Sequence, residues 1–493
     1  MAIAITKDTF SDEDRARFAT RLIDQVAHLS RICDEPSFGE GPTTLGAELE
    51  VPIVGADQRP CPCNTDVLRT MNEPRATVEI ARFNVEFNCT PVAAAGRPFT
   101  AIGDEVRTLL AAGDEAASVH GARLLPVGIL PSVMPEDVTR DAMTDVARYR
   151  ALERQVGRMR GGPAHITIHG EEPLSLEYDG VMLEGANTSF QLHLRASAAR
   201  FADTYNAAQL ATPIAVALSG NSPVFLDHLL WDETRVAVFK QSVEARTADD
   251  LVWRRPARVA FGHGWARRGA PELFAEGVRL HEPLFPVCDD AAPDRPDARA
   301  PRLAELRLHQ GTIWRWNRAI YDPSEGGHLR IEFRALPSGP TVLDMMANAA
   351  LLIGLTVGIR DSIDGFIFGC PFLMAEMSFY RAARDGMDAV MLWPDGVGTS
   401  PKARPVRELA DSLLPLADQG LATLGVESEE RARLLGVIAD RVASGQTGAR
   451  WQRSALRTLR TSGPRRAALD RLVREYAARY DSQQPVHLWP AVD

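Results

Sequence analysis

Four short segments of the sequence alternate apolar residues with charged or amide residues: residues 45–51, 83–89, 189–195 and 328–334. Successive side chains of a β-strand point to opposite faces, so the alternation predicts four strands that each have one apolar and one polar face. The polar faces would together carry Glu48, Glu50, Glu86, Asn88, Gln191, His193, Glu332 and Arg334. Carboxylates and an imidazole suit divalent cations, and an arginine beside them suits phosphate. Phosphoryl transfer from ATP on the floor of a sheet would need these residue types.

Two pairs of polar residues carry this argument most directly. Glu48 and Glu50 share one face of their strand, and a bound cation would relieve their mutual repulsion. The alternative is an exposed strand end with two solvated carboxylates. In the second pair, Glu332 would hold a cation while Arg334 clamps a phosphoryl group. The alternative there is a solvated ladder of salt bridges.

The other polar residues on these segments are open to structural interpretations as well. Glu86 and Asn88 precede a turn at residues 90–91, as the end of an edge strand would. His193 lies between Gln191 and Arg195 on one face, which leaves both a ligand role and a structural role open.

Asn221 and Arg235 follow a predicted helix and a turn-rich stretch, Gly-Asn-Ser-Pro. From the residue types alone, the favoured interpretation is that Asn221 caps the helix or stabilises the turn.

The apolar pattern of the rest of the chain predicts the elements that must position these residues. Helical spacing occurs in several stretches, namely residues 10–33, 98–120, 142–160, 198–219 and 341–360. The last of them contains the longest apolar run, residues 347–359, and is therefore expected to be buried. Two further strands are expected at residues 124–129 and 164–170. The predicted fold class is α+β: an antiparallel sheet with a polar catalytic face, helices on its other face, and a helical C-terminal extension.

The predicted domain organisation is a catalytic domain over residues 1–395 and a helical region over 406–485, within which three or four helices are expected. A linker-like stretch at 394–405 separates them. Residues 286–302 form a polar, proline-rich loop, which we interpret as a lid or a disordered insertion.

Composition excludes several classes of protein. The 493 residues are 45% hydrophobic and 24% charged with a net charge of −10, so a large core is expected and a nucleic-acid surface is not. No signal peptide is expected, and the longest apolar run is too short to span a bilayer. Six cysteines in so long a chain predict no disulfide framework, and we expect a cytoplasmic protein. The sequence leaves the oligomeric state open between a monomer and a homo-oligomer.

Five segments, in this order, resemble the carboxylate–amine ligases of the type 2 glutamate–cysteine ligase family, which share a glutamine synthetase-like fold. They are Gly-Ala-Glu-Leu-Glu at 46–50, Glu-Phe-Asn-Cys-Thr-Pro at 86–91, Phe-Gln-Leu-His-Leu at 190–194, Ala-Leu-Ser-Gly-Asn-Ser-Pro at 217–223 and Arg-Ile-Glu-Phe-Arg at 330–334. The resemblance covers about two-thirds of the chain, residues 45 to 360.

The resemblance implies roles for individual residues. The ligands of two or more Mg²⁺ ions would be Glu48, Glu50, Glu86, His193 and Glu332. Arg334 would stabilise the phosphoryl group in flight, with Arg330 and Arg235 as weaker candidates for contacts to phosphate or a substrate carboxylate. Nucleotide contacts are assigned to Asn88, Gln191 and Asn221.

The resemblance also implies an ATP-driven reaction on small-molecule amino-acid substrates, in which a carboxylate forms an acyl phosphate and an amine then displaces the phosphate. Glutamate and cysteine are the leading pair. Three alternatives stay open: a ligase for another acid and amine, a non-catalytic homologue that binds a nucleotide or metabolite, and a plain α+β binding or scaffold protein.

Overall fold

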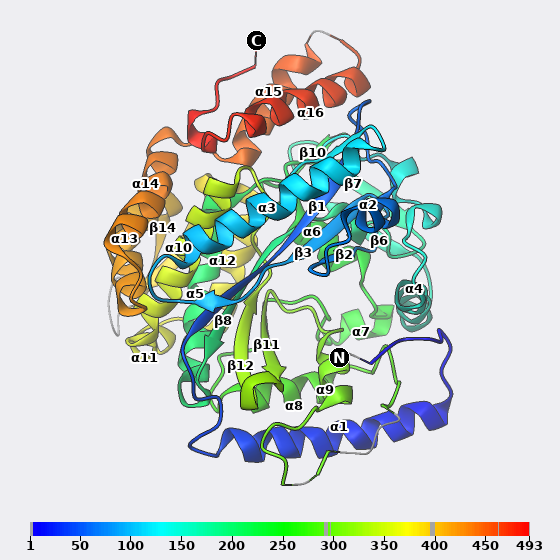
Figure 1. The fold of residues 1–493 in the computed structure, drawn as a ribbon, viewed down its shortest axis with the longest axis vertical. Helices are drawn as coiled ribbons and strands as arrows, with labels where there is room; N and C mark the ends of the chain where they lie inside the picture. The colour runs from blue at the N-terminus through cyan, green and yellow to red at the C-terminus, as the bar shows by residue number, and fades with distance from the viewer. Residues whose placement is uncertain (1–2, 290–293, 296, 395–399, 462, 493) are drawn as a thin grey trace.

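The computed structural model describes residues 3–289, 294–295, 297–394, 400–461 and 463–492. Its centre is an antiparallel sheet in the strand order β11-β12-β8-β1-β3-β2, with β4 and β5 attached to β1 (Figure 1). The strands are β1 (Thr44–Gly55), β2 (Ala76–Val78), β3 (Asn84–Asn88), β4 (Val92–Ala93), β5 (Ala122–Leu124), β8 (Phe190–Ala196), β11 (Asn317–Asp322) and β12 (His328–Phe333). The four alternating segments are therefore confirmed as neighbouring strands: β12, β8, β1 and β3.

The apolar side of the sheet is covered by three long helices. These are α3 (Pro98–Ser118), α5 (Phe201–Ser219) and α10 (Val342–Arg360), which confirm the helices predicted at 98–120, 198–219 and 341–360. Inward-facing strand residues such as Leu49, Leu192 and Ile331 are at most 2% exposed beneath them. By length and composition α10 could cross a membrane, but 89% of its most apolar window is buried inside the protein, as expected of a core helix.

The polar side of the sheet is bounded by α4 (Ala147–Arg160), α6 (Thr234–Ser242) and a group of helices at the β11 edge. The group consists of α8 (Ala270–Leu280) and α9 (Ala304–Gln310), which contact β11, and α1 (Asp12–Cys33), which packs across both (Figure 1). Helices α1 and α4 confirm the predictions at 10–33 and 142–160. The polar side chains of the sheet are therefore enclosed rather than exposed on a flat surface.

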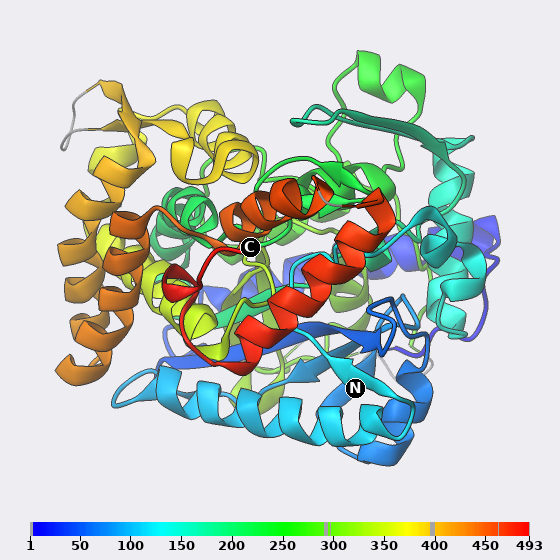
Figure 2. The same cartoon turned by 90° about the horizontal axis from the view of Figure 1, so that it is seen from above.

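Among the residues described, the C-terminal region contains four α-helices: α13 (Val406–Thr423), α14 (Ser428–Ser444), α15 (Gly448–Arg460) and α16 (Arg465–Asp481). Helix α13 lies directly against α10, so close that a Cβ on Gly420 would lie 2.0 Å from the carbonyl oxygen of Gly354. Seen from above, α15 and α16 cross the centre of the molecule (Figure 2). The helical extension is thus confirmed, and its first helix packs on the core helix α10.

Some predicted elements differ from the structure. Of the strand expected at 124–129, only Leu124 belongs to β5, and the strand expected at 164–170 is β6 (Ala164–Ile168), which pairs with β7 (Leu174–Tyr178) outside the main sheet. The linker-like stretch contributes to a strand pair, β13 (Val390–Pro394) with β14 (Pro401–Pro405). Part of the suggested lid, residues 290–293 and 296, lies outside the described residues. The remaining elements are α2 (Asn64–Met71), α7 (Ala248–Val252), α11 (Ile363–Ile367), α12 (Phe372–Asp385), β9 (Val224–Phe225) and β10 (His228–Leu229).

Candidate active site

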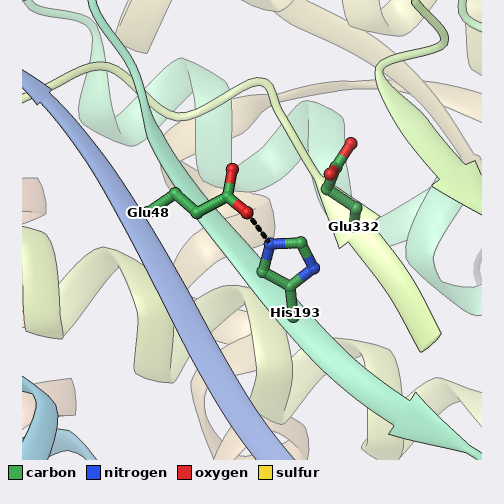
Figure 3. A group of neighbouring side chains, drawn as sticks. All are labelled: Glu48, His193 and Glu332. Carbon is green, nitrogen blue, oxygen red and sulfur yellow. Dashed lines mark hydrogen bonds and ion pairs between the residues drawn. The ribbon is translucent and has the colours of Figure 1, made fainter. Parts of the chain in front are cut away.

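The register of the sheet gathers the predicted carboxylates into two clusters. Residues directly opposite each other on neighbouring strands share a face, and His193 is opposite Glu332 while Glu50 is opposite Glu86. The first cluster consists of Glu48, His193 and Glu332, whose ligand atoms lie within 4.8 Å of one another. We call it the histidine cluster. In Figure 3 its side chains rise from three adjacent strands, and the Glu48 carboxylate points at the imidazole.

The second cluster, the carboxylate cluster, consists of Glu50, Glu79 and Glu86, again within 4.8 Å. Glu79 was not among the predicted ligands. It follows β2, a strand of three residues, which is too short to show an alternating pattern in the sequence.

Arginines surround the histidine cluster. Arg318 donates two hydrogen bonds to Glu332, at 2.7 and 3.0 Å, and Arg334 donates a third at 3.1 Å. Burial alone would raise the pKa of Glu332, but the charges of Arg318 and Arg334 outweigh it and hold the pKa well below its usual range. Burial likewise opposes ionisation of Glu48, yet His193 keeps the pKa of that carboxyl lowered. Both carboxylates are thus ionised and ready to bind a cation.

The imidazole of His193 bridges Glu48 and Arg330. Its Nε2 atom lies 2.9 Å from Glu48, and its Nδ1 atom accepts a hydrogen bond of 3.2 Å from Arg330 Nε. A neutral ring that accepts at Nδ1 carries its proton on Nε2. Coordination of a metal ion by Nε2 would therefore require the proton on Nδ1, and Arg330 would have to give up this hydrogen bond.

In the carboxylate cluster the pKa values are raised, whereas those of Glu48 and Glu332 are lowered. Burial, followed by the charge of Glu50, raises the pKa of Glu79 to about 8. Burial and the charges of Glu79 and Glu48 raise the pKa of Glu86 well above its ordinary value of 4.5. Burial also raises the pKa of Glu50, against the opposing charges of Arg235 and Arg334. Three carboxylates that repel each other in this way form a site that a divalent cation would stabilise.

These pKa shifts predict how Mg²⁺ should stabilise the protein at different pH values. The pKa of Glu79 is about 8 in the folded chain and near its ordinary value of 4.5 in the unfolded chain. The protonated carboxyl therefore stabilises the metal-free fold. This stabilisation is fully present below pH 4.5 and is lost as the pH rises through 8. Mg²⁺ binds the ionised form, so the increase in unfolding temperature caused by Mg²⁺ should be larger at pH 8.5 than at pH 6.5.

Thermal unfolding with and without Mg²⁺ at the two pH values measures this difference. Glu79→Gln should reduce it, while Glu50 and Glu86 keep part of the pH dependence. Glu177→Gln, which changes an exposed carboxylate on β7, should not. Equal stabilisation by Mg²⁺ at both pH values in the wild-type protein would show that this cluster does not bind the ion.

The polar face opens into three cavities. One of about 300 Å³ contains the carboxylate cluster, Gln191, Arg334 and Glu184, with an aromatic wall of Phe239, Phe285 and Trp314. A second, of about 340 Å³, contains Glu48, Asn88, His193, Arg195 and Arg330. The third, of about 220 Å³, contains Glu332 with Arg148, Arg307, Arg318 and Arg330. Arginine is thus concentrated around the histidine cluster, and carboxylate around the other.

Nine of the eleven predicted site residues lie on this face: Glu48, Glu50, Glu86, Asn88, Gln191, His193, Arg330, Glu332 and Arg334. Asn88 donates a hydrogen bond of 2.7 Å to Glu86, and Gln191 accepts one of 2.6 Å from Arg334. The structure adds three residues that the sequence did not reveal, Glu79, Glu184 and Arg318.

Two predicted residues, Arg235 and Asn221, do not reach the cavities. Arg235 is 4% exposed and pairs with Glu233 at 2.8 Å, while its guanidinium also faces the backbone carbonyls of residues 334 and 335. Asn221 is fully buried and bonds to Ser338 and Tyr476. The structure therefore does not bring the predicted phosphate contact Arg235 or the predicted nucleotide contact Asn221 to the cavities, because the polar groups of both side chains are engaged inside the protein.

Comparisons with known proteins relate the chain to a family and to solved structures. The family model described as glutamate-cysteine ligase family 2 matches residues 44–475, a range that extends into α16. No curated protein sequence matches the chain significantly. Among solved structures, a glutamate–cysteine ligase from Francisella tularensis in complex with AMP superposes with a TM-score of 0.54 at 13% identity, covering 90% of this chain and 93% of that one. A bifunctional glutathione synthetase from Pasteurella multocida gives a TM-score of 0.47 at 12% identity, covering 93% and 55%. The first of these likenesses confirms the predicted glutamine synthetase-like α+β fold class.

Proposed function

The chain belongs to glutamate-cysteine ligase family 2 and is an ATP-dependent carboxylate–amine ligase, and we propose that it joins glutamate to cysteine through an acyl phosphate. The observation that carries the proposal is the position of Arg334 between the two acidic clusters. Its Nη1 atom bonds to Glu332 of the histidine cluster, and the charge of Glu50 in the carboxylate cluster helps to raise its pKa. Its Nε atom is buried and has no hydrogen-bond partner among the described residues. A phosphoryl oxygen would satisfy this donor.

The donor sets of the two clusters fit Mg²⁺. Five carboxylates supply hard oxygen ligands, and one imidazole completes the histidine cluster. Bound there, Mg²⁺ would neutralise charge on the phosphate oxygens and orient them for transfer. The protein's own contribution is to hold the two clusters on adjacent strands of one rigid sheet.

The charges of the cavities suggest where each substrate binds. A triphosphate carries up to four negative charges, so we place it beside the histidine cluster, in the two cavities that share Arg330. Arg318 also lines one of these cavities, and Arg195 lines the other. The acidic cavity would attract the ammonium groups of the amino acids, and its aromatic wall would pack against their apolar parts.

The chemistry then follows in two steps. A substrate carboxylate oxygen attacks the γ-phosphorus and ADP leaves, while Arg334 donates to the phosphoryl oxygens. The amine next attacks the acyl carbon, phosphate leaves with the former carboxylate oxygen, and the amine loses a proton. Glu184 lies in the acidic cavity, and burial together with the charge of Glu50 raises its pKa to about 8, which suits a proton acceptor near neutral pH.

Phosphate release from Mg-ATP by the purified protein tests the proposal. We expect release with glutamate plus cysteine and little with either amino acid alone, and none of it in a Glu48→Gln control. Release with a different acid and amine would retain the ligase chemistry and replace the substrates. Binding of Mg-ATP without release for any pair would contradict catalysis and identify a non-catalytic homologue.

A further inference from the structure

A chain of buried polar contacts connects the C-terminal helices to the segment that carries Arg334. It comprises five side chains, all at most 4% exposed: Gln452, Tyr476, Asn221, Glu233 and Arg235. We call these five residues the relay. None of them lines the three cavities described above, although Arg235 was a predicted phosphate or substrate contact and Asn221 a predicted nucleotide contact.

Asn221 is the centre of the relay. Its Nδ2 atom donates to the carbonyl oxygen of Ser338 at 2.8 Å and to the hydroxyl of Tyr476 on α16 at 2.9 Å. Tyr476 in turn donates to the carbonyl oxygen of Pro126 at 2.9 Å. The amide of Gln452 on α15 donates to Asn221 Oδ1 at 2.9 Å. One asparagine therefore joins α15 and α16 to the loop that follows β12.

The relay continues from Asn221 to the backbone of Arg334. The amide N–H of Asn221 donates to one carboxylate oxygen of Glu233 at 3.0 Å, and the other oxygen accepts a hydrogen bond from Arg235 at 2.8 Å. The Arg235 guanidinium faces the carbonyl oxygens of Arg334 and Ala335, at 3.4 and 3.2 Å. Residues 334–338 are thus held at both ends, by Arg235 at the first and by Asn221 at the last.

Packing around the relay leaves no space for adjustment. A Cβ on Gly448, the first residue of α15, would lie 2.0 Å from Asn221 Oδ1. Gly339 has a φ of +76°, and a Cβ there would lie 2.3 Å from the carbonyl oxygen of Pro126. Close-packed polar groups of this kind specify one arrangement, because a shifted one would leave buried donors unsatisfied.

We infer that helices α15 and α16 position Arg334 for phosphoryl transfer through the relay. These two helices therefore contribute to catalysis although they do not line the cavities. The inference rests on the proposed function. Arg334 follows the last residue of β12, so its placement depends on the loop as much as on the sheet. Misplacement of a catalytic group by a fraction of an ångström lowers turnover while leaving ground-state binding nearly intact.

The test is Tyr476→Phe, which removes one hydroxyl from the relay and retains the aromatic ring. We expect kcat to fall roughly 5- to 10-fold, the effect of losing one buried hydrogen bond, with the KM for Mg-ATP within about twofold of wild type. The matched control is Tyr480→Phe, the same change one helical turn further along α16, whose ring lies beside Arg123 rather than in the relay. It should leave kcat unchanged.

A second measurement separates positioning from general damage. In an Arg334→Ala background, Tyr476→Phe should cause no further loss of kcat, because the residue through which it acts is gone. An equal loss in both backgrounds, or an unchanged kcat in the single variant, would overturn the inference.

Hydrogen exchange of the backbone amides of residues 334–336 and 338 gives a readout that does not depend on turnover. Tyr476→Phe should accelerate it, and Tyr480→Phe should not. If the wild-type protein fails to turn over ATP, the proposed function is wrong. The exchange measurement still decides whether the relay holds residues 334–338 in place. Unchanged exchange in Tyr476→Phe would refute that role of the relay.

Discussion

Glu48→Gln and Glu332→Gln should each abolish ATP turnover, lowering kcat by roughly 100-fold or more while the protein stays folded. Both substitutions replace a carboxylate by an amide of the same shape, so the strands and their packing are retained. What is lost is a negative ligand in the histidine cluster, where the two carboxylates lie beside the one imidazole. Glu48→Gln tests the loss of charge more specifically than Glu332→Gln, because an amide at position 48 can still accept the hydrogen bond of His193.

Steady-state phosphate release at saturating ATP measures this effect, and thermal unfolding checks the fold. Glu177→Gln serves as the control, since it makes the same chemical change on β7, a strand outside the main sheet. Wild-type turnover in Glu48→Gln or Glu332→Gln would remove these residues from the site.

Arg334→Ala should lower kcat by roughly 1,000-fold, the scale on which an arginine that stabilises phosphoryl transfer acts, with a much smaller loss of ATP affinity. The reason is that its unpartnered Nε atom would gain its full interaction only when charge develops on the phosphoryl group. Arg334→Lys keeps the charge but not the forked geometry, so it should recover part of the loss.

Turnover and equilibrium binding of Mg-ATP must both be measured for this variant. Arg107→Ala, at an exposed arginine of α3, controls for the loss of a cation as such. A raised KM with an unchanged kcat would assign Arg334 to substrate binding and contradict its role in the transition state.

The part of the site that could be predicted from the sequence lies on long strands with strict alternation. Glu48, His193 and Glu332 belong to such strands, so the period of two alone places them on a polar face. Arg318 was not predicted because the sequence of β11 is Asn-Arg-Ala-Ile-Tyr-Asp. Ile320 occupies the polar face of this strand and breaks the alternation of polar and apolar residues. Glu79 was not predicted because the strand that it follows, β2, has only three residues.

Two predicted site residues, Asn221 and Arg235, lie outside the cavities for a different reason. Asn221 stands in a segment that resembles the family, and Arg235 follows that segment. The side chain of Asn221 is engaged by Gln452 and Tyr476, more than 200 residues further along the chain, and Arg235 is engaged by Glu233. Sequence patterns report local periodicity, whereas the docking of α15 and α16 is a tertiary contact that no local pattern encodes.

The most direct test of the acyl phosphate follows an oxygen atom. Glutamate labelled with ¹⁸O in its carboxylates is turned over with cysteine and Mg-ATP, and the released phosphate is analysed by mass spectrometry. Attack of the carboxylate on the γ-phosphorus predicts that each phosphate released during ligation carries one ¹⁸O atom. Ligation that leaves the phosphate unlabelled, or that places the label in AMP, would contradict the mechanism.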